Sequence, residues 1–186
     1  GLDGEGRLAW TVDLAPGDLL VPVALRGSPV GSVAEIAPAG MAVAAEIGAR
    51  LARHPGAALL VDYGHAGPAV GDTLQAVRRH AFAPVLEDPG EADLTAHVDF
   101  TALADAAGTA GAAAYGPVGQ GALLLALGIR QRADALKRSV AGAGADVIEA
   151  AFRRLVGDDQ MGRLFKALAL ASPGAPVPAG FEGQVP

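Results

Sequence analysis

Residues 57–65 read Ala-Ala-Leu-Leu-Val-Asp-Tyr-Gly-His, a short apolar run that ends in an acid, a phenol, a glycine and an imidazole. A run of this kind between turn signals is typical of a buried parallel strand in an open α/β sheet. Chemistry in such sheets collects at the carboxyl ends of the strands. We therefore predict an α/β fold and place Asp62, Tyr63 and His65 at its sheet edge as candidate catalytic residues. The alternative is a strand followed by a merely polar loop.

A helix and a tight turn come directly before this strand. Pro38 suits a first helical turn, and an apolar face repeats at helical period after it. His54, Pro55 and Gly56 then stop the helix near residue 53. Helix, turn and buried strand form half of a βαβ unit. The same signals predict strands at 112–118 and 164–171 and helices over 100–109, 120–127, 129–141 and 145–156.

The segments between these elements are rich in glycine, proline and acid. Residues 72–82 fit a helix or an extended segment, and residues 84–96 read as an acidic loop. The last residues, 173–186, form a Pro/Gly-rich tail that we expect on the surface. We therefore predict one main domain over residues 1–172, followed by this tail.

Composition narrows the classes of function. The 186 residues are 51% hydrophobic but only 4% aromatic, so the core must consist of Ala, Val and Leu. The net charge of −6 and the lack of a basic block argue against nucleic-acid binding. Without cysteine, the chain forms neither disulfides nor thiolate metal sites. No apolar run approaches the roughly 18 residues that span a bilayer.

The ratio of Arg to Lys and the residues at the amino terminus indicate where the chain comes from. Arg greatly outnumbers Lys, which occurs only at Lys137 and Lys166, and this bias suggests a GC-rich bacterial genome. No signal segment opens the chain, so we expect a cytoplasmic bacterial protein. The chain begins Gly-Leu-Asp-Gly without methionine, and we therefore expect a fragment of a longer protein.

Polar residues concentrate a second time at residues 91–100, which read Glu-Ala-Asp-Leu-Thr-Ala-His-Val-Asp-Phe. Asp99 is a typical N-cap for the helix that follows, and Asp93 and Thr95 are suited to cap the turn before it. A polar loop between two elements is also where an α/β fold places substrate contacts. We name Asp93, Thr95, His97 and Asp99 as candidate substrate-binding residues.

Histidines and carboxylates offer a different chemistry. Three of the four histidines, His65, His80 and His97, lie in one stretch with several acids, and Asp62 precedes them. Such a cluster can hold a divalent metal, although no HxH, HxxxH or HExxH spacing occurs here. A metal-dependent hydrolase therefore stays an alternative to simple surface and loop roles. The chain has no GxSxG nucleophile elbow, no P-loop and no GxGxxG after a strand.

Several stretches together resemble the MidA family of class I S-adenosylmethionine-dependent methyltransferases. They keep the order of the family's motifs from about residue 5 to residue 181. The stretches are Pro29–Glu35, Leu60–His65, Gly71–Val77, Asp93–Phe100 and Gln160–Gly162, the last leading to Phe165-Lys166. Any one of these motifs alone would be weak, whereas the ordered set is specific.

The resemblance implies an S-adenosyl-L-methionine-dependent methyltransferase that acts on an arginine of a protein. Its mitochondrial members methylate a subunit of respiratory complex I during assembly, which implies a protein partner of that kind. The resemblance covers only the carboxyl-terminal half of the family's domain. The glycine-rich loop, the acid after the second strand and the Asn-Glu motif, which hold most of the methyl donor, lie upstream in the family. We therefore expect the isolated chain to be inactive.

The resemblance also implies a strand order. Residues 57–62, 112–118 and 164–171 correspond to the fifth, sixth and seventh strands of a Rossmann-like sheet, with the seventh antiparallel between the other two. The fifth strand would then have one edge without its usual partner, and a bare apolar edge promotes association. We expect the chain to associate with itself or with the missing half.

Roles for the candidate residues follow from the chemistry of a guanidinium acceptor. Carboxylates such as Asp62, Asp93 and Asp99 orient a guanidinium by paired hydrogen bonds. Tyr63 could pack against the acceptor, and His65 could accept a proton or close the pocket. The alternative of another class is a non-enzymatic assembly or interaction module, which the acidic surface and bare edge permit.

Overall fold

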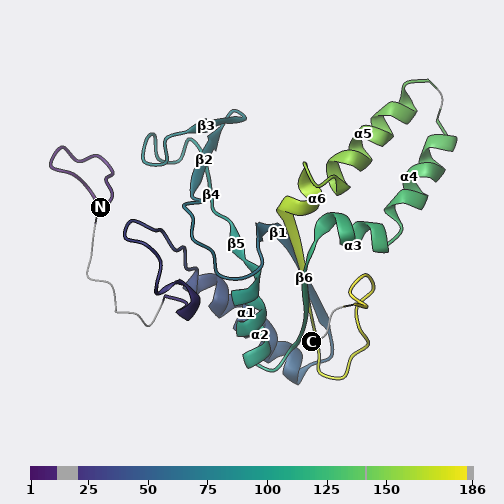
Figure 1. The fold of residues 1–186 in the computed structure, drawn as a ribbon, viewed down its shortest axis with the longest axis horizontal. Coiled ribbons are helices and arrows are strands. Elements are labelled where there is room, and N and C mark those ends of the chain that lie inside the picture. The colour runs from purple at the N-terminus through teal and green to yellow at the C-terminus, as the bar shows by residue number, and fades with distance from the viewer. Residues whose placement is uncertain (12–20, 141, 184–186) are drawn as a thin grey trace. The chain divides into compact units, whose positions relative to one another are not determined.

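The computed structural model describes residues 1–11, 21–140 and 142–183, drawn in Figure 1. The chain divides into two compact units. The first unit comprises Gly1–Ile36 and Pro68–His97, and the second comprises Ala37–Gly67 and Val98–Pro186. No helix among the described residues is long and apolar enough to cross a membrane.

A four-stranded mixed sheet forms the centre of the second unit. Its order is β5-β1-β7-β6, in which β7 runs antiparallel to both β1 and β6, and β5 runs parallel to β1. This confirms the predicted α/β class, the three predicted strands and the antiparallel seventh strand between the other two. The strands are β1 (Ala57–His65), β5 (Val98–Asp99), β6 (Ala113–Gly119) and β7 (Phe165–Ala171).

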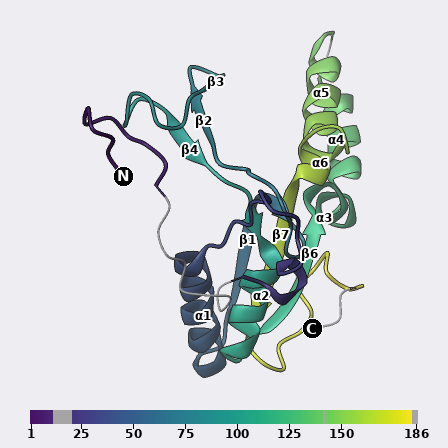
Figure 2. The same ribbon diagram turned by 60° about the vertical axis from the view of Figure 1, so that its left-hand side comes forward.

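Two helices, α1 (Pro38–Arg53) and α2 (Phe100–Thr109), cover one face of this sheet (Figure 2). Both helices begin and end where the sequence predicts them. Gly48 of α1 permits the close packing, because a Cβ there would lie 2.4 Å from the carbonyl oxygen of Ala107. The core between helices and sheet consists of Ala44, Leu51, Phe100, Ala107, Leu168 and Leu170.

The opposite face is covered by α3 (Gln120–Ala126) and by the carboxyl-terminal segment. Phe181 is only 2% exposed and belongs to a second core cluster with Tyr115 and Leu123. The expectation of a surface tail over 173–186 is therefore wrong at Phe181, because an aromatic ring fills a gap that small alanines leave in the sheet face. Residues 184–186 of that tail lie outside the described residues.

The helices α4 (Ile129–Arg138) and α5 (Gly144–Val156) run antiparallel as a pair, which Figures 1 and 2 show in green. The guanidinium carbon of Arg130 lies 4.4 Å from the ring centre of Phe152, and this cation–π contact joins the two helices. The helix expected over 129–141 ends earlier, at Arg138, because Ser139 caps it; residue 141 lies outside the described residues. A short helix, α6 (Met161–Leu164), precedes β7.

The first unit contains a small antiparallel sheet of order β3-β2-β4 and a 3₁₀ helix, η2 (Val23–Leu25). In the sequence, residues 72–82 fit either a helix or an extended segment. The structure shows the hairpin of β2 (Gln75–Arg78) and β3 (Ala81–Ala83) there. The acidic loop expected over 84–96 is interrupted by a strand, β4 (Asp93–Thr95). Strands of three residues are too short to give an alternating pattern.

One edge of β1 is largely unpaired among the described residues. Strand β7 pairs with β1 from Ala57 to Tyr63, whereas β5 pairs on the other side only at Gly64 and His65. Leu59 and Val61 of β1 are 60% and 46% exposed. This part of β1 therefore has the bare edge that the sequence predicts.

Candidate functional site

The candidate catalytic residues follow one another at the carboxyl end of β1, but they do not share one face. Side chains alternate along a strand, and Leu60 of β1 packs into the core under α1 and α2. Asp62 is two residues further and lies on the same face as Leu60, whereas Tyr63 and His65 lie on the opposite face. The structure thus places all three residues at the end of β1, with Asp62 on one face and Tyr63 and His65 on the other.

Asp62 is exposed and its neighbour across the sheet is a lysine. Its Oδ1 accepts a hydrogen bond of 2.8 Å from the amide of Tyr63, and Lys166 of β7 is its register partner. The ammonium group of Lys166 donates to the carbonyl oxygen of Arg163. Burial, together with the nearby charge of Arg163, lowers the pKa of Lys166. A carboxylate and a cation therefore occupy one face of this strand end.

Two aromatic rings occupy the opposite face. Tyr63 and Phe165 are register partners on β1 and β7, and their ring centres lie 5.6 Å apart in an edge-to-face arrangement at 85°. This geometry fixes the direction of the Tyr63 ring. His65 is held by a 2.6 Å contact between its Nδ1 and the carbonyl oxygen of Gly67.

The close approach of β1 and β5 depends on a glycine. A Cβ at Gly64 would lie 2.1 Å from the carbonyl oxygen of Val98, so this position excludes any side chain. The parallel pairing places His65 beside Asp99. Asp99 acts as the predicted N-cap of α2, because its Oδ1 accepts from the amides of Thr101 and Ala102 at 3.0 and 3.1 Å.

The remaining candidate residues lie in the first unit. Asp93 is exposed on β4 and pairs with Val77, and Thr95 pairs with Gln75. His97 is half-buried, and its amide donates a 2.8 Å hydrogen bond to Oγ1 of Thr73. The candidate residues therefore divide between the units: Asp93, Thr95 and His97 belong to the first, and Asp62, Tyr63, His65 and Asp99 to the second.

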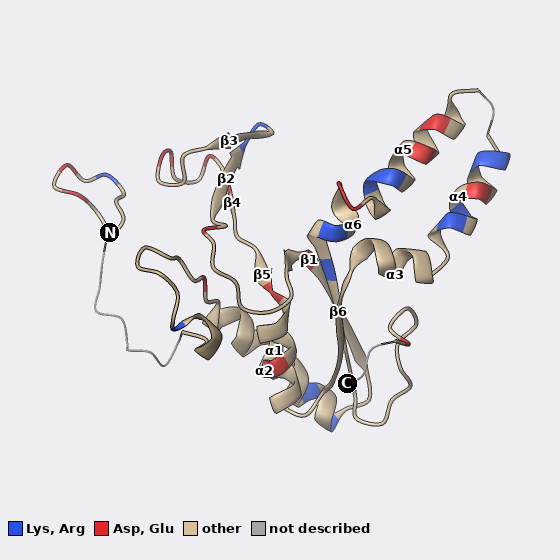
Figure 3. Cartoon of the chain, in the orientation of Figure 1, with Lys and Arg blue, Asp and Glu red and all other residues tan. Residues whose placement is uncertain are grey.

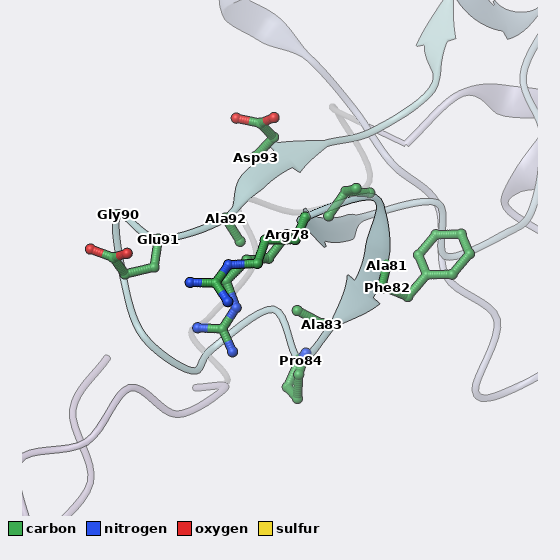
Figure 4. Close-up of a pocket in the computed structure, with 11 residues that line it drawn as sticks. Arg78, Ala81, Phe82, Ala83, Pro84, Gly90, Glu91, Ala92 and Asp93 are labelled. Atoms are coloured by element: carbon green, nitrogen blue, oxygen red, sulfur yellow. The ribbon is translucent and has the colours of Figure 1, made fainter.

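A hollow of about 770 Å³ lies beside the β2–β3 hairpin in the first unit, with Arg78, Glu91 and Asp93 among its lining residues. Arg78 forms an ion pair of 2.7 Å with Asp88. Figure 4 shows the ring of Phe82 on the other side of β3 from the Arg78 guanidinium. Among the candidate substrate-binding residues, Asp93 lines this hollow, and other charged residues line it as well.

The histidines do not assemble with carboxylates into a metal centre. Among the residues that the structure describes, no three His, Asp or Glu side chains lie close enough to hold an ion. The metal-dependent hydrolase on His65, His80, His97 and Asp62 therefore has no geometric support. His80 instead occupies the β2–β3 turn at a φ of 64°.

Sequence reasoning did not single out several residues that contact the candidate ones. Phe165 and Lys166 reach the end of β1 only because β7 inserts between β1 and β6. Glu35 and Thr73 join through hydrogen bonds between segments far apart in the chain. All four lie within the stretches that resemble the MidA family, and that resemblance is the signal that could have identified them.

The chain is similar to one protein family and to several proteins of known name. Residues 4–118 match a family model described as "Putative S-adenosyl-L-methionine-dependent methyltransferase". Protein arginine methyltransferase NDUFAF7, mitochondrial, of Xenopus laevis is 37% identical over 134 residues, which are 71% of this chain and 30% of that protein. The NDUFAF7 homolog of Caenorhabditis elegans is 36% identical over 153 residues, 81% of this chain and 35% of that protein.

Two solved structures from Burkholderia thailandensis share the fold. An uncharacterized protein has a TM-score of 0.78 at 25% identity and matches over 97% of this chain and 50% of its own length. A "likely methyl transferase" bound to S-adenosyl-homocysteine has a TM-score of 0.63 at 28% identity, over 76% of this chain and 38% of its own. The chain thus spans about a third of these curated relatives and half or less of the solved ones.

Proposed function

The chain belongs to the family of S-adenosyl-L-methionine-dependent methyltransferases, because the family model matches more than half of its residues, and from this premise we propose that it is part of a protein arginine methyltransferase. The observation that carries the proposal is the match to relatives named protein arginine methyltransferase at 36–37% identity. The solved relative with bound S-adenosyl-homocysteine, the product left by methyl donation, supports the choice of donor.

The acceptor side of the reaction is where this chain contributes most. Methyl transfer requires a positioned acceptor nitrogen rather than extensive covalent chemistry by the protein. Asp62 is exposed and keeps acceptor capacity beyond its hydrogen bond from Tyr63, since a carboxylate offers about four lone-pair sites. We assign Asp62 to the acceptor guanidinium, whereas the ring of Tyr63 lies on the opposite face of β1 and packs against Phe165. Asp93, Thr95 and His97 belong to the first unit, and we propose that they bind the protein acceptor as well.

The N-terminus of α2 does not offer the methyl donor a free binding site. The first amides of α2, at Thr101 and Ala102, would suit the donor's carboxylate, but the side chain of Asp99 already occupies them. We therefore propose that the donor is held mainly by segments outside these 186 residues and that the isolated chain is inactive. The extension to a subunit of respiratory complex I rests on the sequence resemblance alone.

The test uses the protein expressed from the complete reading frame that contains this chain. Titration calorimetry measures binding of S-adenosyl-L-methionine, and transfer of a tritiated methyl group to an Arg-Gly repeat peptide measures activity. We expect Asp62→Asn to lower methyl transfer by about tenfold or more while donor affinity stays unchanged. Asp105→Asn, the same change at an exposed position of α2, is the matched control and should leave both unchanged. Donor binding without any methylated arginine would overturn the assignment.

A second function is favoured by one observation: within the part of the chain that the structure describes, one edge of β1 beside the exposed Leu59 and Val61 is unpaired. Such an edge is a template for pairing with another strand. An interaction module would use it to bind a protein without catalysis. Donor binding separates the two proposals, since the module needs none.

A further inference from the structure

Two separate segments of the first unit meet at the carboxylate of Glu35, and a third binds the Thr73 hydroxyl beside it. Oε1 of Glu35 accepts from the amides of Thr73 and Leu74, both at 3.0 Å, and Oε2 accepts from the Thr73 hydroxyl. The neighbouring backbone is joined as well, because Ala34 bridges Val70. The carboxylate thus uses both oxygens to hold the chain that leads into β2.

The Thr73 hydroxyl also binds the third segment, at His97. A hydroxyl has one proton to donate and two lone pairs. Donation of that proton to Glu35 directs the lone pairs of Thr73 Oγ1 away from the carboxylate, and one of them accepts the His97 amide at 2.8 Å. Hydrogen bonds to an ionised group are about twice as strong as neutral ones. We call Glu35, Thr73 and the amides of Leu74 and His97 the Glu35 network.

The Glu35 network lies next to a short strand at the end of the first unit. Strand β4 has three residues and pairs with β2, and His97, just beyond it, is the last residue of the first unit. Three residues of pairing hold such a strand weakly. The next residue, Val98, already belongs to the β1–β5 pairing of the second unit. The Glu35 network therefore fixes the backbone at the end of the segment that carries Asp93, Thr95 and His97.

We propose that Glu35 is a positioning residue for acceptor recognition, acting through Thr73 on the segment 93–97. Glu35 contacts neither donor nor acceptor; it sets where Thr95 and His97 are held when the protein acceptor binds. The inference rests on the proposed arginine methyltransferase function. It goes beyond that function by assigning acceptor affinity, and not donor affinity, to a carboxylate that is distant in sequence from every candidate residue.

The first arm of the test measures the network itself. In Glu35→Gln an amide nitrogen replaces one carboxylate oxygen, so either the Thr73 hydroxyl or the amides of Thr73 and Leu74 lose their acceptor. We expect amide hydrogen exchange at Leu74 and His97 to speed up by about tenfold, the scale of one lost hydrogen bond. Exchange in β7 should stay the same. Glu87→Gln, the same change at an exposed position of the first unit, is the matched control.

The second arm measures function in the protein from the complete reading frame. Glu35→Gln and Thr73→Val should raise the KM for an Arg-Gly repeat peptide by about tenfold, with the Kd for S-adenosyl-L-methionine unchanged. Thr73→Ser keeps the hydroxyl and should restore the wild-type KM, which a loss of packing alone would not allow. Equal changes in Thr73→Ser and Thr73→Val would overturn the proposal, as would an unchanged KM in an active Glu35→Gln. Absence of methyl transfer by the wild type would instead refute the proposed function.

Discussion

At the scale of single residues, Gly64 determines how closely β1 and β5 can pair. An added Cβ would lie 2.1 Å from a backbone oxygen of Val98, which cannot rotate away as a side chain would. We expect Gly64→Ala to lower the free energy of unfolding by about 1–3 kcal/mol. Gly108→Ala is the control, because its Cβ would meet nothing within 4 Å on a helix, where alanine is preferred. Urea unfolding measures both, and equal stability of Gly64→Ala and wild type would contradict the expectation.

The lowered pKa of Lys166 predicts that the stability of the chain depends on pH in the alkaline range. Burial and the charge of Arg163 lower its pKa in the folded chain below the unfolded value of 10.5. Between the two pKa values the unfolded chain binds more protons, so stability rises with pH. The contribution is fully present above pH 10.5 and is lost as pH falls through the lowered pKa. Unfolding of wild type and Lys166→Met should show a difference that changes across this window, and a constant difference would refute the sign.

The candidate residues show how far a sequence alone leads at this scale. Asp99 was predictable as an N-cap because capping depends on the next three residues. The position of Lys166 beside Asp62 was not, since it depends on the register between β1 and β7, which the predicted strand order does not give. The alternating faces of β1 likewise separate Asp62 from Tyr63 and His65, although the three stand within four residues.

At the scale of elements, the unpaired edge of β1 predicts association. Leu59 and Val61 are exposed along a stretch with one side free of ladder partners among the described residues. A charged side chain on an exposed edge opposes pairing with another chain. We expect sedimentation velocity to show self-association of the chain at micromolar concentration, reduced in Val61→Lys. Val147→Lys, on exposed α5, is the control and should associate like the wild type. A monomer at all concentrations would exclude the edge as an interface.

Element length decided which parts of the fold were predictable. Helices α1 and α2 have clear periodicity and stop signals, strand β7 is a nearly continuous apolar run, and the structure confirms all three. The β2–β3 hairpin was ambiguous because its turn uses Arg79 and His80 at φ of 51° and 64° where glycine or asparagine is usual. Figure 3 shows charged residues spaced along α4 and α5, and both helices lie where the sequence predicts helices, although α4 ends earlier than expected.

At the scale of the whole molecule, the carboxyl-terminal segment is part of the core. Phe181 is buried against Leu123 and the sheet, although it lies in a stretch with the composition of a surface tail. Only the packed structure shows that the alanine-rich sheet face leaves room for this ring. We expect Phe181→Ala to lower the free energy of unfolding by about 3–5 kcal/mol, because it removes a buried aromatic side chain and leaves a cavity.

The same substitution on an exposed ring gives a matched control. Phe82 is 82% exposed on β3, so Phe82→Ala removes the same atoms with almost no burial to lose and should change stability by less than about 0.5 kcal/mol. Chemical unfolding of both variants and wild type, followed by circular dichroism, measures the difference. If Phe181→Ala were as stable as Phe82→Ala, the Phe181 ring would contribute nothing to the stability of the fold. A large loss in Phe181→Ala alone would show that burial of this ring stabilises the fold.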